Sequence, residues 1–294
     1  MTQLRNLLAA SDLSAPSRHA LARAAMIARD SGANLRLLHV LRAGLPEPLQ
    51  RLLGSDADSV LARVRDTTFQ ELGQLASDVC EPLSVAPSLR ITTGPVIHDI
   101  ATEADAHDAD LVVLGARGMG FMRHLLLGSI AERMLRKTLR PVLVVKQLPH
   151  ERYQRVLVPV DFSTYSPLAV KMARAVAPRA EIILLHAFDN SQEGTLRYAG
   201  VDESVIHQYL TEARRAAMEE LRRLALDTGL DSERLQLQAI NGHPSTCILE
   251  QEEEKDVDLI VIGKHGRGVS EELLLGSVSK HVLAGARGDV LVVR

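Results

Sequence analysis

The sequence predicts an α/β protein of two repeated, doubly wound domains, each an open five-stranded parallel sheet flanked by helices. Short apolar runs alternate with amphipathic segments along the chain, and this alternation is typical of βαβ units. The apolar runs are unbroken, as expected for strands that helices cover on both faces. The whole series occurs twice in the same order, so one fold describes both halves.

The repeat has a nearly constant spacing. Asp161 follows Asp12 by 149 residues, and the other matching residues recur after 147 or 148. This spacing is too long for a solenoid, whose units have about 20–50 residues, and it suits an independent domain. We therefore expect one domain over residues 1–147 and a second over residues 153–294, joined by a short polar segment.

In the first half, apolar runs predict the strands and periodic segments predict the helices. Gly32 is a stop signal for the first helix, Pro95 suits the first turn of the third, and Ser129 is the candidate cap of the fourth. The expected strands of this half are 5–10, 34–40, 88–94, 110–115 and 141–146, and the expected helices are 17–32, 55–79, 95–109 and 129–139. The matching strands of the second half are 155–160, 181–187, 234–240, 258–263 and 289–293.

The composition argues against several classes of protein. The chain of 294 residues is 46% hydrophobic and 24% charged, and its net charge of −3 gives no electrostatic reason to expect nucleic acid or membrane binding. Its N-terminus lacks the pattern of a signal peptide, and no apolar run is long enough to cross a membrane. Cys80 and Cys247 are too far apart for a metal finger and fit a reducing compartment. We expect a cytoplasmic protein.

A glycine pattern follows the fourth strand of each half. It reads Gly-x2-Gly-x9-Gly-Ser and begins at Gly115 in the first half and at Gly263 in the second. In doubly wound sheets, ligands bind beyond the carboxyl ends of the strands, where the strand order reverses. The first strands end at the same edge, beside Asp12 and Asp161. We therefore expect a ligand site at this edge in each half.

The glycine pattern is suited to phosphate groups. Gly115 and Gly118 allow a tight turn with backbone N–H groups near an anion. Gly128 and Ser129 open a helix whose free N–H groups and dipole attract negative charge. A β-branched residue at Gly118 or Gly128 would block this approach and would resist a left-handed φ. The plain alternative is a glycine turn followed by an ordinary serine cap, but two copies in one fold context favour a nucleotide.

The two copies of the pattern differ in charge. Their charged residues are Arg117 and Arg123 in the first copy, and Lys264, Arg267, Glu271 and Glu272 in the second. The net charge is therefore +2 in the first copy and 0 in the second. We expect the first half to bind a polyphosphate more tightly; the alternative is that the two glutamates point into solvent.

With these motifs the chain resembles a tandem universal stress protein, that is, two UspA-type domains in one polypeptide. The resemblance rests on "LAASDLS" and "LVPVDFS" at the first strands, on "LLHV" and "LLHA" in the second strands, and on both glycine patterns. It implies a Rossmann-like or flavodoxin-like fold of the adenine nucleotide alpha hydrolase-like type. It also implies ATP binding, with or without Mg²⁺, in members that carry the glycine pattern.

The resemblance further implies which residues meet the nucleotide. The nucleoside set is Asp12 and Val40 in the first half, and Asp161 and Ala187 in the second. The phosphate set is Gly115, Arg117, Gly118, Gly128 and Ser129 in the first half, and Gly263, His265, Gly266, Gly276 and Ser277 in the second. The implied site also includes the residue two positions before each acid. This residue is Ala10 in the first half and the more usual Pro159 in the second. The last strands differ as well, because Asp289 stands where the first half keeps Pro141.

Members of the resembled family dimerise through their last strand. We therefore expect segments 141–145 and 289–293 to pair as an intramolecular pseudo-dimer, and we expect further homo-oligomers. We expect an adenine nucleotide as the partner, and we expect the protein to bind neither nucleic acid nor membranes.

Other polar residues favour ordinary roles. The segment 98–110 collects histidines and aspartates, but its spacing fits a solvated surface better than a metal site. His39 and His186 match across the repeat, and we expect a structural hydrogen bond for each, with ligand contact as the alternative. No Ser-His-Asp or Cys-His set is legible, so no catalytic residue is assigned.

These observations predict a protein that binds ATP or a related adenine nucleotide and acts in regulation or stress response. Fast enzymatic turnover is not expected, because no general base is legible in either half. Two alternatives remain open at this point, a slow ATP hydrolase and a nucleotide-free scaffold.

Overall fold

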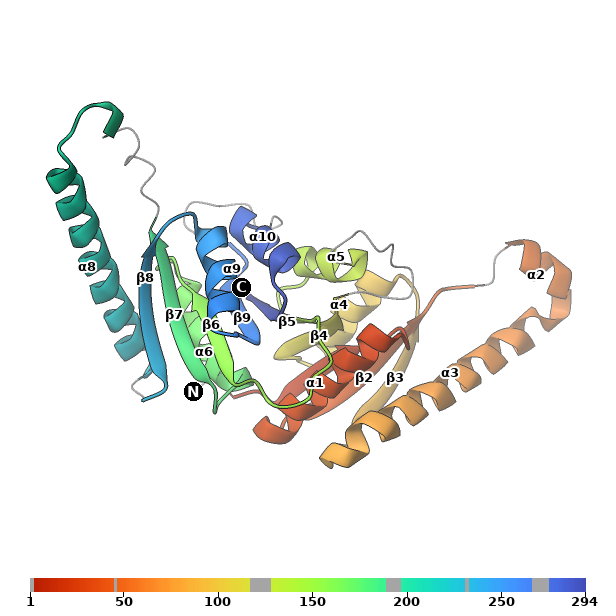
Figure 1. The fold of residues 1–294 in the computed structure, drawn as a ribbon. Helices are drawn as coiled ribbons and strands as arrows, with labels where there is room; N and C mark the ends of the chain where they lie inside the picture. The colour runs from red at the N-terminus through yellow and green to blue at the C-terminus, as the bar shows by residue number, and fades with distance from the viewer. Residues whose placement is uncertain (1–2, 45–46, 117–127, 189–196, 231–232, 266–274) are drawn as a thin grey trace. The chain divides into compact units, whose positions relative to one another are not determined.

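The computed structural model describes residues 3–44, 47–116, 128–188, 197–230, 233–265 and 275–294. The chain divides into two compact units, Gln3–Arg152 and Tyr153–Arg294, which we call the N-terminal half and the C-terminal half. In the ribbon, the first runs from red to yellow-green and the second from green to blue (Figure 1). Each half contributes five strands and its own helices, so the two are described in turn.

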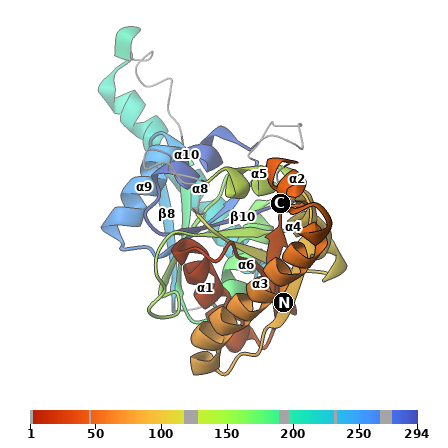
Figure 2. The same ribbon diagram turned by 90° about the vertical axis from the view of Figure 1, so that its right-hand side faces the viewer.

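The N-terminal half is a five-stranded parallel sheet in the order β3-β2-β1-β4-β5. Helix α1 packs against α3, and α4 packs against α5. In Figure 2, α1 and α3 lie in the foreground of this half. The elements are β1 (Asn6–Ala10), α1 (Ala15–Ser31), β2 (Asn34–Leu41), α2 (Glu47–Leu53), α3 (Ala57–Cys80), β3 (Ser88–Thr93), α4 (Val96–Ala106), β4 (Leu111–Gly115), α5 (Ser129–Lys137) and β5 (Val142–Val145), with short 3₁₀ turns at Gly54–Asp56 and Glu81–Leu83.

The C-terminal half repeats this arrangement in the order β8-β7-β6-β9-β10, again with parallel strands. Helix α8 packs along β7 and β8, and α9 packs against α10. The elements are β6 (Arg155–Pro159), α6 (Ser166–Val176), β7 (Glu181–Phe188), α8 (Glu203–Asp227), β8 (Leu235–Asn241), α9 (Pro244–Glu254), β9 (Leu259–Gly263), α10 (Ser277–Gly285) and β10 (Asp289–Val293). The predicted fold class is confirmed, because all ten expected strands are present in the expected order.

The central strands form the core of each half. In β1, Leu7 and Leu8 are fully buried although they point to opposite faces of the sheet, and Leu157 and Val158 are buried in the same way in β6. An unbroken apolar strand needs cover on both faces, which helices on both sides of a doubly wound sheet supply. The sheet therefore holds the carboxyl ends of its central strands at a fixed edge.

Helix ends match the expected signals only in part. Gly32 ends α1, as predicted, and the structure gives it a left-handed φ of 72°. Pro95 and Ser129 are each one position from where the sequence suggested, since Pro95 caps α4 and Ser129 is the first residue of α5. Helix α2 was not predicted, and none of its residues is buried. Among the helices in the described ranges, none has the length and apolar character needed to cross a membrane.

Candidate functional site

The strand order of each half reverses between its two central strands. β1 pairs with β2 on one side and with β4 on the other, so the chain leaves β1 and β4 at neighbouring points of one edge. We call this the carboxyl edge of the sheet. In the N-terminal half it carries Ala10, Asp12, Val40, Gly115, Gly128 and Ser129, and in the C-terminal half it carries Pro159, Asp161, Ala187, Gly263, His265, Gly276 and Ser277. The structure thus brings the described members of each predicted set to one edge.

Asp12 and Asp161 hold the turns that follow β1 and β6. The Ser14 N–H donates to Oδ1 of Asp12 at 3.2 Å, and the Ser163 N–H donates to Oδ1 of Asp161 at 3.0 Å. An aspartate that accepts from the backbone two residues ahead forms an Asx turn, which fixes the direction of the carboxylate. Both acids are half-buried, so each carboxylate lies in the surface of the carboxyl edge.

The residue after each aspartate has an unusual backbone. Leu13 has a φ of 65° and Phe162 a φ of 60°, values that residues with a Cβ seldom adopt. Such strain persists only where the surrounding structure enforces it, and it is common at binding sites. This conformation was not predicted, because neither Leu nor Phe is typical of it. The same strain at matching positions shows that the turn is a feature of both halves.

A histidine fastens each of these turns to the neighbouring strand. Nδ1 of His39 lies 2.9 Å from the carbonyl oxygen of Ser11, and Nδ1 of His186 lies 2.8 Å from that of Val160. A carbonyl oxygen only accepts, so Nδ1 carries the proton in both rings. The expected structural hydrogen bond is therefore present in both halves.

The ends of each glycine-pattern loop are joined by a backbone hydrogen bond. The Gly128 N–H donates to the carbonyl oxygen of Ala116 at 2.7 Å, and the Gly276 N–H donates to that of Lys264 at 3.0 Å. We call these the closing hydrogen bonds. They place the end of β4 beside the start of α5, and the end of β9 beside the start of α10. Arg117, Gly118, Arg123, Gly266, Arg267, Glu271 and Glu272 lie outside the described residues.

The reason for glycine at the helix start differs from the predicted one. Gly128 has a φ of −70° and Gly276 a φ of −57°, which any residue adopts, so the expected left-handed backbone at Gly128 is wrong. Space explains the choice at Gly276, where a Cβ would lie 3.2 Å from the Lys264 carbonyl oxygen. At Gly263 a Cβ would lie 3.2 Å from the carbonyl oxygen of His265. Close approach of backbone segments is the physical need at both positions.

The residues after β9 are buried. The Lys264 side chain is 2% exposed and His265 is 5% exposed. The His265 ring lies 6.5 Å from the ring of Tyr165, between centroids, and so lies near the start of α6. Sequence reasoning placed His265 in the phosphate set without anticipating this burial. Ser279 was missed, and its Oγ donates to the carbonyl oxygen of Gly263 at 2.7 Å, which further ties α10 to the end of β9.

The acidic and thiol groups elsewhere have structural contacts. Asp110 accepts from the N–H groups of Arg5 at 2.7 Å and Asn6 at 3.0 Å, which ties the start of β1 to the start of β4. Within the described ranges, no three His, Cys, Asp or Glu side chains are placed to hold a metal ion. Cys80 and Cys247 are both buried, and they form no disulfide with each other.

Comparison with known proteins agrees with this architecture. A model of the universal stress protein family matches the chain twice, over residues 3–146 and 152–294. A universal stress protein of Mycolicibacterium smegmatis is 29% identical over 98% of this chain and 96% of its own length, and one of Mycobacterium bovis is 31% identical over 72% and 70%. The crystal structure of a universal stress protein from Archaeoglobus fulgidus shares the fold, with a TM-score of 0.68 at 20% identity over 100% of this chain and 99% of that one. This chain belongs to the universal stress protein family, with two domains of that family in one polypeptide.

Proposed function

We propose that each half binds ATP or a related adenine nucleotide at its carboxyl edge, and that binding serves a regulatory role in stress response. The observation that carries the proposal is the closing hydrogen bond of each half, which sets a helix start beside the strand that neighbours the aspartate turn. Ligands of doubly wound sheets bind at this reversal of strand order. Asp12 and Val40, or Asp161 and Ala187, would meet the nucleoside.

The helix start supplies the chemistry for phosphate. In α5, the Gly128 N–H is engaged in the closing hydrogen bond, so the N–H groups of the first helical turn and the Ser129 hydroxyl are the proposed donors. These groups and the helix dipole attract negative charge. In α10, Ser277 has the same position as Ser129 has in α5. Because the ring of His265 is buried, we propose that its backbone contacts the phosphate instead. Arg117, Gly118 and Gly266 complete the proposed sets.

We further propose that the N-terminal half is the tighter site. Its glycine pattern carries a net charge of +2, compared with 0 in the C-terminal half. At exposed positions, two charges change affinity for a polyphosphate by roughly fivefold. The burial of Lys264 fits this order, because a buried cation is less available to a ligand in solvent.

The first test identifies bound nucleotide. The full chain is purified and denatured, and the released small molecules are separated by chromatography, with ATP, ADP and cyclic AMP as standards. Released ATP, or titration of emptied protein with ATP to saturation, supports the proposal. Release of ADP together with steady turnover favours a slow ATP hydrolase instead. Absence of both released nucleotide and calorimetric binding contradicts the proposal and leaves a scaffold.

The second test assigns the tighter site. Asp12→Asn and Asp161→Asn each keep an oxygen that accepts from the turn, so they remove charge while preserving the Asx turn. We expect Asp12→Asn to abolish the tighter phase of ATP binding and Asp161→Asn to spare it. Asp66→Asn, at an exposed position of α3, is the control for the loss of one negative charge. If Asp12→Asn spared the tighter phase and Asp161→Asn abolished it, the C-terminal half would be the tighter site and the proposal would be wrong.

The last strands carry a separate proposal about assembly. β5 and β10 are apolar and are the final strands in the sheet order of their own halves. Apolar edge strands tend to pair, so we propose that β5 and β10 form an intramolecular pseudo-dimer and that further copies associate. Disulfide formation between cysteines introduced at Leu143 and Leu291 tests the first part, and light scattering tests the second.

A further inference from the structure

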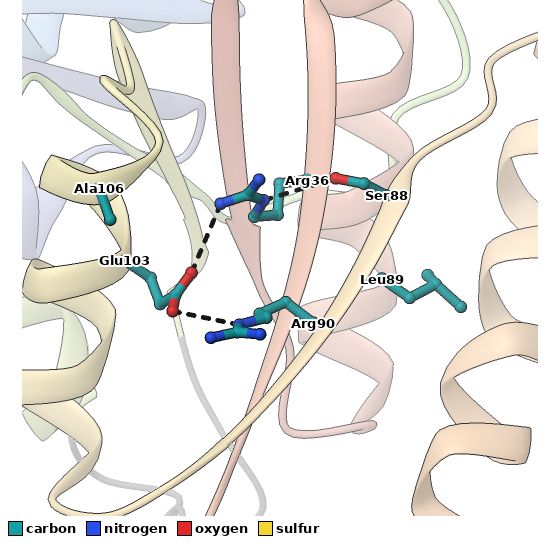
Figure 3. Close-up of a pocket in the computed structure, with 6 residues that line it drawn as sticks. All are labelled: Arg36, Ser88, Leu89, Arg90, Glu103 and Ala106. Atoms are coloured by element: carbon teal, nitrogen blue, oxygen red, sulfur yellow. Dashed lines mark hydrogen bonds and ion pairs between the residues drawn. The ribbon is translucent and has the colours of Figure 1, made fainter.

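The N-terminal half has a pocket far from its carboxyl edge. Its volume is about 330 Å³, and it is lined by Arg36, Ser88, Leu89, Arg90, Glu103 and Ala106 (Figure 3). Arg36 is in the first part of β2, Ser88 begins β3, and Ala106 ends α4. Parallel strands share one direction, so the pocket lies toward the amino ends of the strands, opposite to the proposed nucleotide site. We call it the arginine pocket.

The arginines reach the pocket because of strand register. Arg36 pairs with Ser88, and Leu38 with Arg90, so both guanidinium groups leave the same face of the sheet. Figure 3 shows Glu103 between them, while Leu89 points away. Nη1 of Arg36 lies 3.5 Å from one carboxylate oxygen of Glu103, and Nε of Arg90 lies 3.2 Å from the other. A single carboxylate therefore serves two cations.

The pocket has an excess of donors and of positive charge. Two arginines and one glutamate leave a net charge of +1. Arg36 also donates from Nε to the Ser88 hydroxyl at 3.5 Å, but in the described part of the chain the two terminal nitrogens of Arg90 meet no acceptor. The Glu103 side chain is only 11% exposed, whereas that of Arg90 is 57% exposed. The buried carboxylate thus holds in place an accessible guanidinium fork.

The C-terminal half shows that the fold does not need these charges. Its matching residues are Ile183 for Arg36, Gln238 for Arg90 and Gln251 for Glu103, as the register of β7 with β8 and the start of α9 establish. The same strands and helix form around these neutral residues. The C-terminal half keeps its structure without these three charges. We therefore attribute the charges of the N-terminal half to ligand binding rather than to stability.

We propose that the arginine pocket binds a small oxyanion through Arg90 and Arg36. A guanidinium fork matches the paired oxygens of a carboxylate or a phosphate group, and the excess charge attracts either. The volume of the pocket is near the lower end of ligand sites, which are about 300–1,000 Å³, so the ligand is a small molecule. Glu103 positions the two arginines and at the same time competes with the anion for them.

Calorimetric titration of the full chain with phosphate and with acetate, at constant ionic strength, tests this proposal. We expect the wild-type chain to bind at least one of these anions, and the tighter one identifies the group recognised. Arg90→Gln, which installs the residue of the C-terminal half, should weaken that binding by about tenfold, the effect of losing a charged hydrogen-bond donor. Glu103→Gln should strengthen it, because the arginines lose their competing carboxylate.

Further variants separate this pocket from other anion sites. The triple variant Arg36→Ile, Arg90→Gln and Glu103→Gln copies the neutral set and should lose the binding while keeping the circular dichroism spectrum. Arg140→Gln removes one charge from an arginine that already has two carboxylates, Asp105 and Asp108, and should change affinity less than twofold. An affinity that is unchanged in Arg90→Gln, or that falls in Glu103→Gln, would overturn the proposal, as would a wild-type chain that binds neither anion.

Discussion

The rings of Phe162 and His186 lie with their centroids 4.4 Å apart. The same imidazole bonds to the carbonyl oxygen of Val160, so the strained turn after β6 is held by both a ring contact and a hydrogen bond. In the N-terminal half, His39 makes the equivalent hydrogen bond, but Leu13 offers no ring to pack against it. The two turns therefore have the same backbone with unequal support.

Leu13→Asn should relieve strain in the N-terminal turn. Asparagine tolerates a left-handed φ better than leucine does, and the conformation costs most residues about 1–2 kcal/mol. We expect the free energy of unfolding to stay constant or rise by up to about 1 kcal/mol, measured by urea denaturation. Leu8→Asn, at a fully buried position of β1, is the control and should lower stability by several kcal/mol, on the order of 2–5. A loss of similar size in both variants would mean that the strain is not relieved.

Two glycines should respond to alanine in opposite ways. At Gly73, within α3, an added Cβ would meet its nearest neighbour, Leu89, at an ordinary 3.8 Å, and alanine favours helices by about 0.5–1 kcal/mol. At Gly288, the Cβ would lie 2.9 Å from the carbonyl oxygen of Asp258, which is backbone and cannot turn aside. We expect Gly73→Ala to raise the melting temperature and Gly288→Ala to lower the free energy of unfolding by about 1–3 kcal/mol. Equal effects would contradict the contacts described.

Cys80 should resist thiol reagents until the protein unfolds. Burial raises the pKa of its thiol to about 11, so the reactive thiolate is scarce at neutral pH, and the side chain is fully buried. Burial also raises the pKa of Cys247, with a smaller contribution from Glu250. We expect no rapid reaction with an aromatic disulfide reagent in native protein and two thiols per chain in denaturant. Ser59→Cys, at an exposed position, should add one thiol that reacts at once.

His107 should make stability depend on pH. Burial lowers the pKa of His107 below its ordinary value of 6.5, Arg36 lowers it further, and Glu103, Asp108 and Asp110 act in the opposite direction. Because the folded state binds this proton less readily than the unfolded state, the stability is complete above pH 6.5 and is lost as the pH falls through the folded pKa.

The measurement is the free energy of unfolding between about pH 7.5 and 5.5. His107→Gln should lose less stability over this range than the wild-type chain, since it removes the group that resists protonation. His98→Gln, at an exposed position of α4, the helix that His107 caps, is the control. A variant at position 107 whose pH dependence equals that of the wild type would show that another group is responsible.

The sequence by itself determined the repeat, the strands and the edge at which the candidate site lies. Strands such as Leu259–Gly263 are unbroken apolar runs, and a run of that length between helical segments is typical of a parallel strand covered on both faces. The position of Asp12 and Gly115 followed from strand order, because the carboxyl ends of neighbouring parallel strands meet at one edge.

Only the tertiary structure decided the contacts that cross from one element to another. The closing hydrogen bond between Gly128 and Ala116, and the left-handed φ of Leu13, depend on how two segments meet, and local sequence preference does not specify that. The arginine pocket is the clearest case. Arg36 and Glu103 are 67 residues apart in the chain, and they meet because strand register and helix packing bring β2 and α4 together.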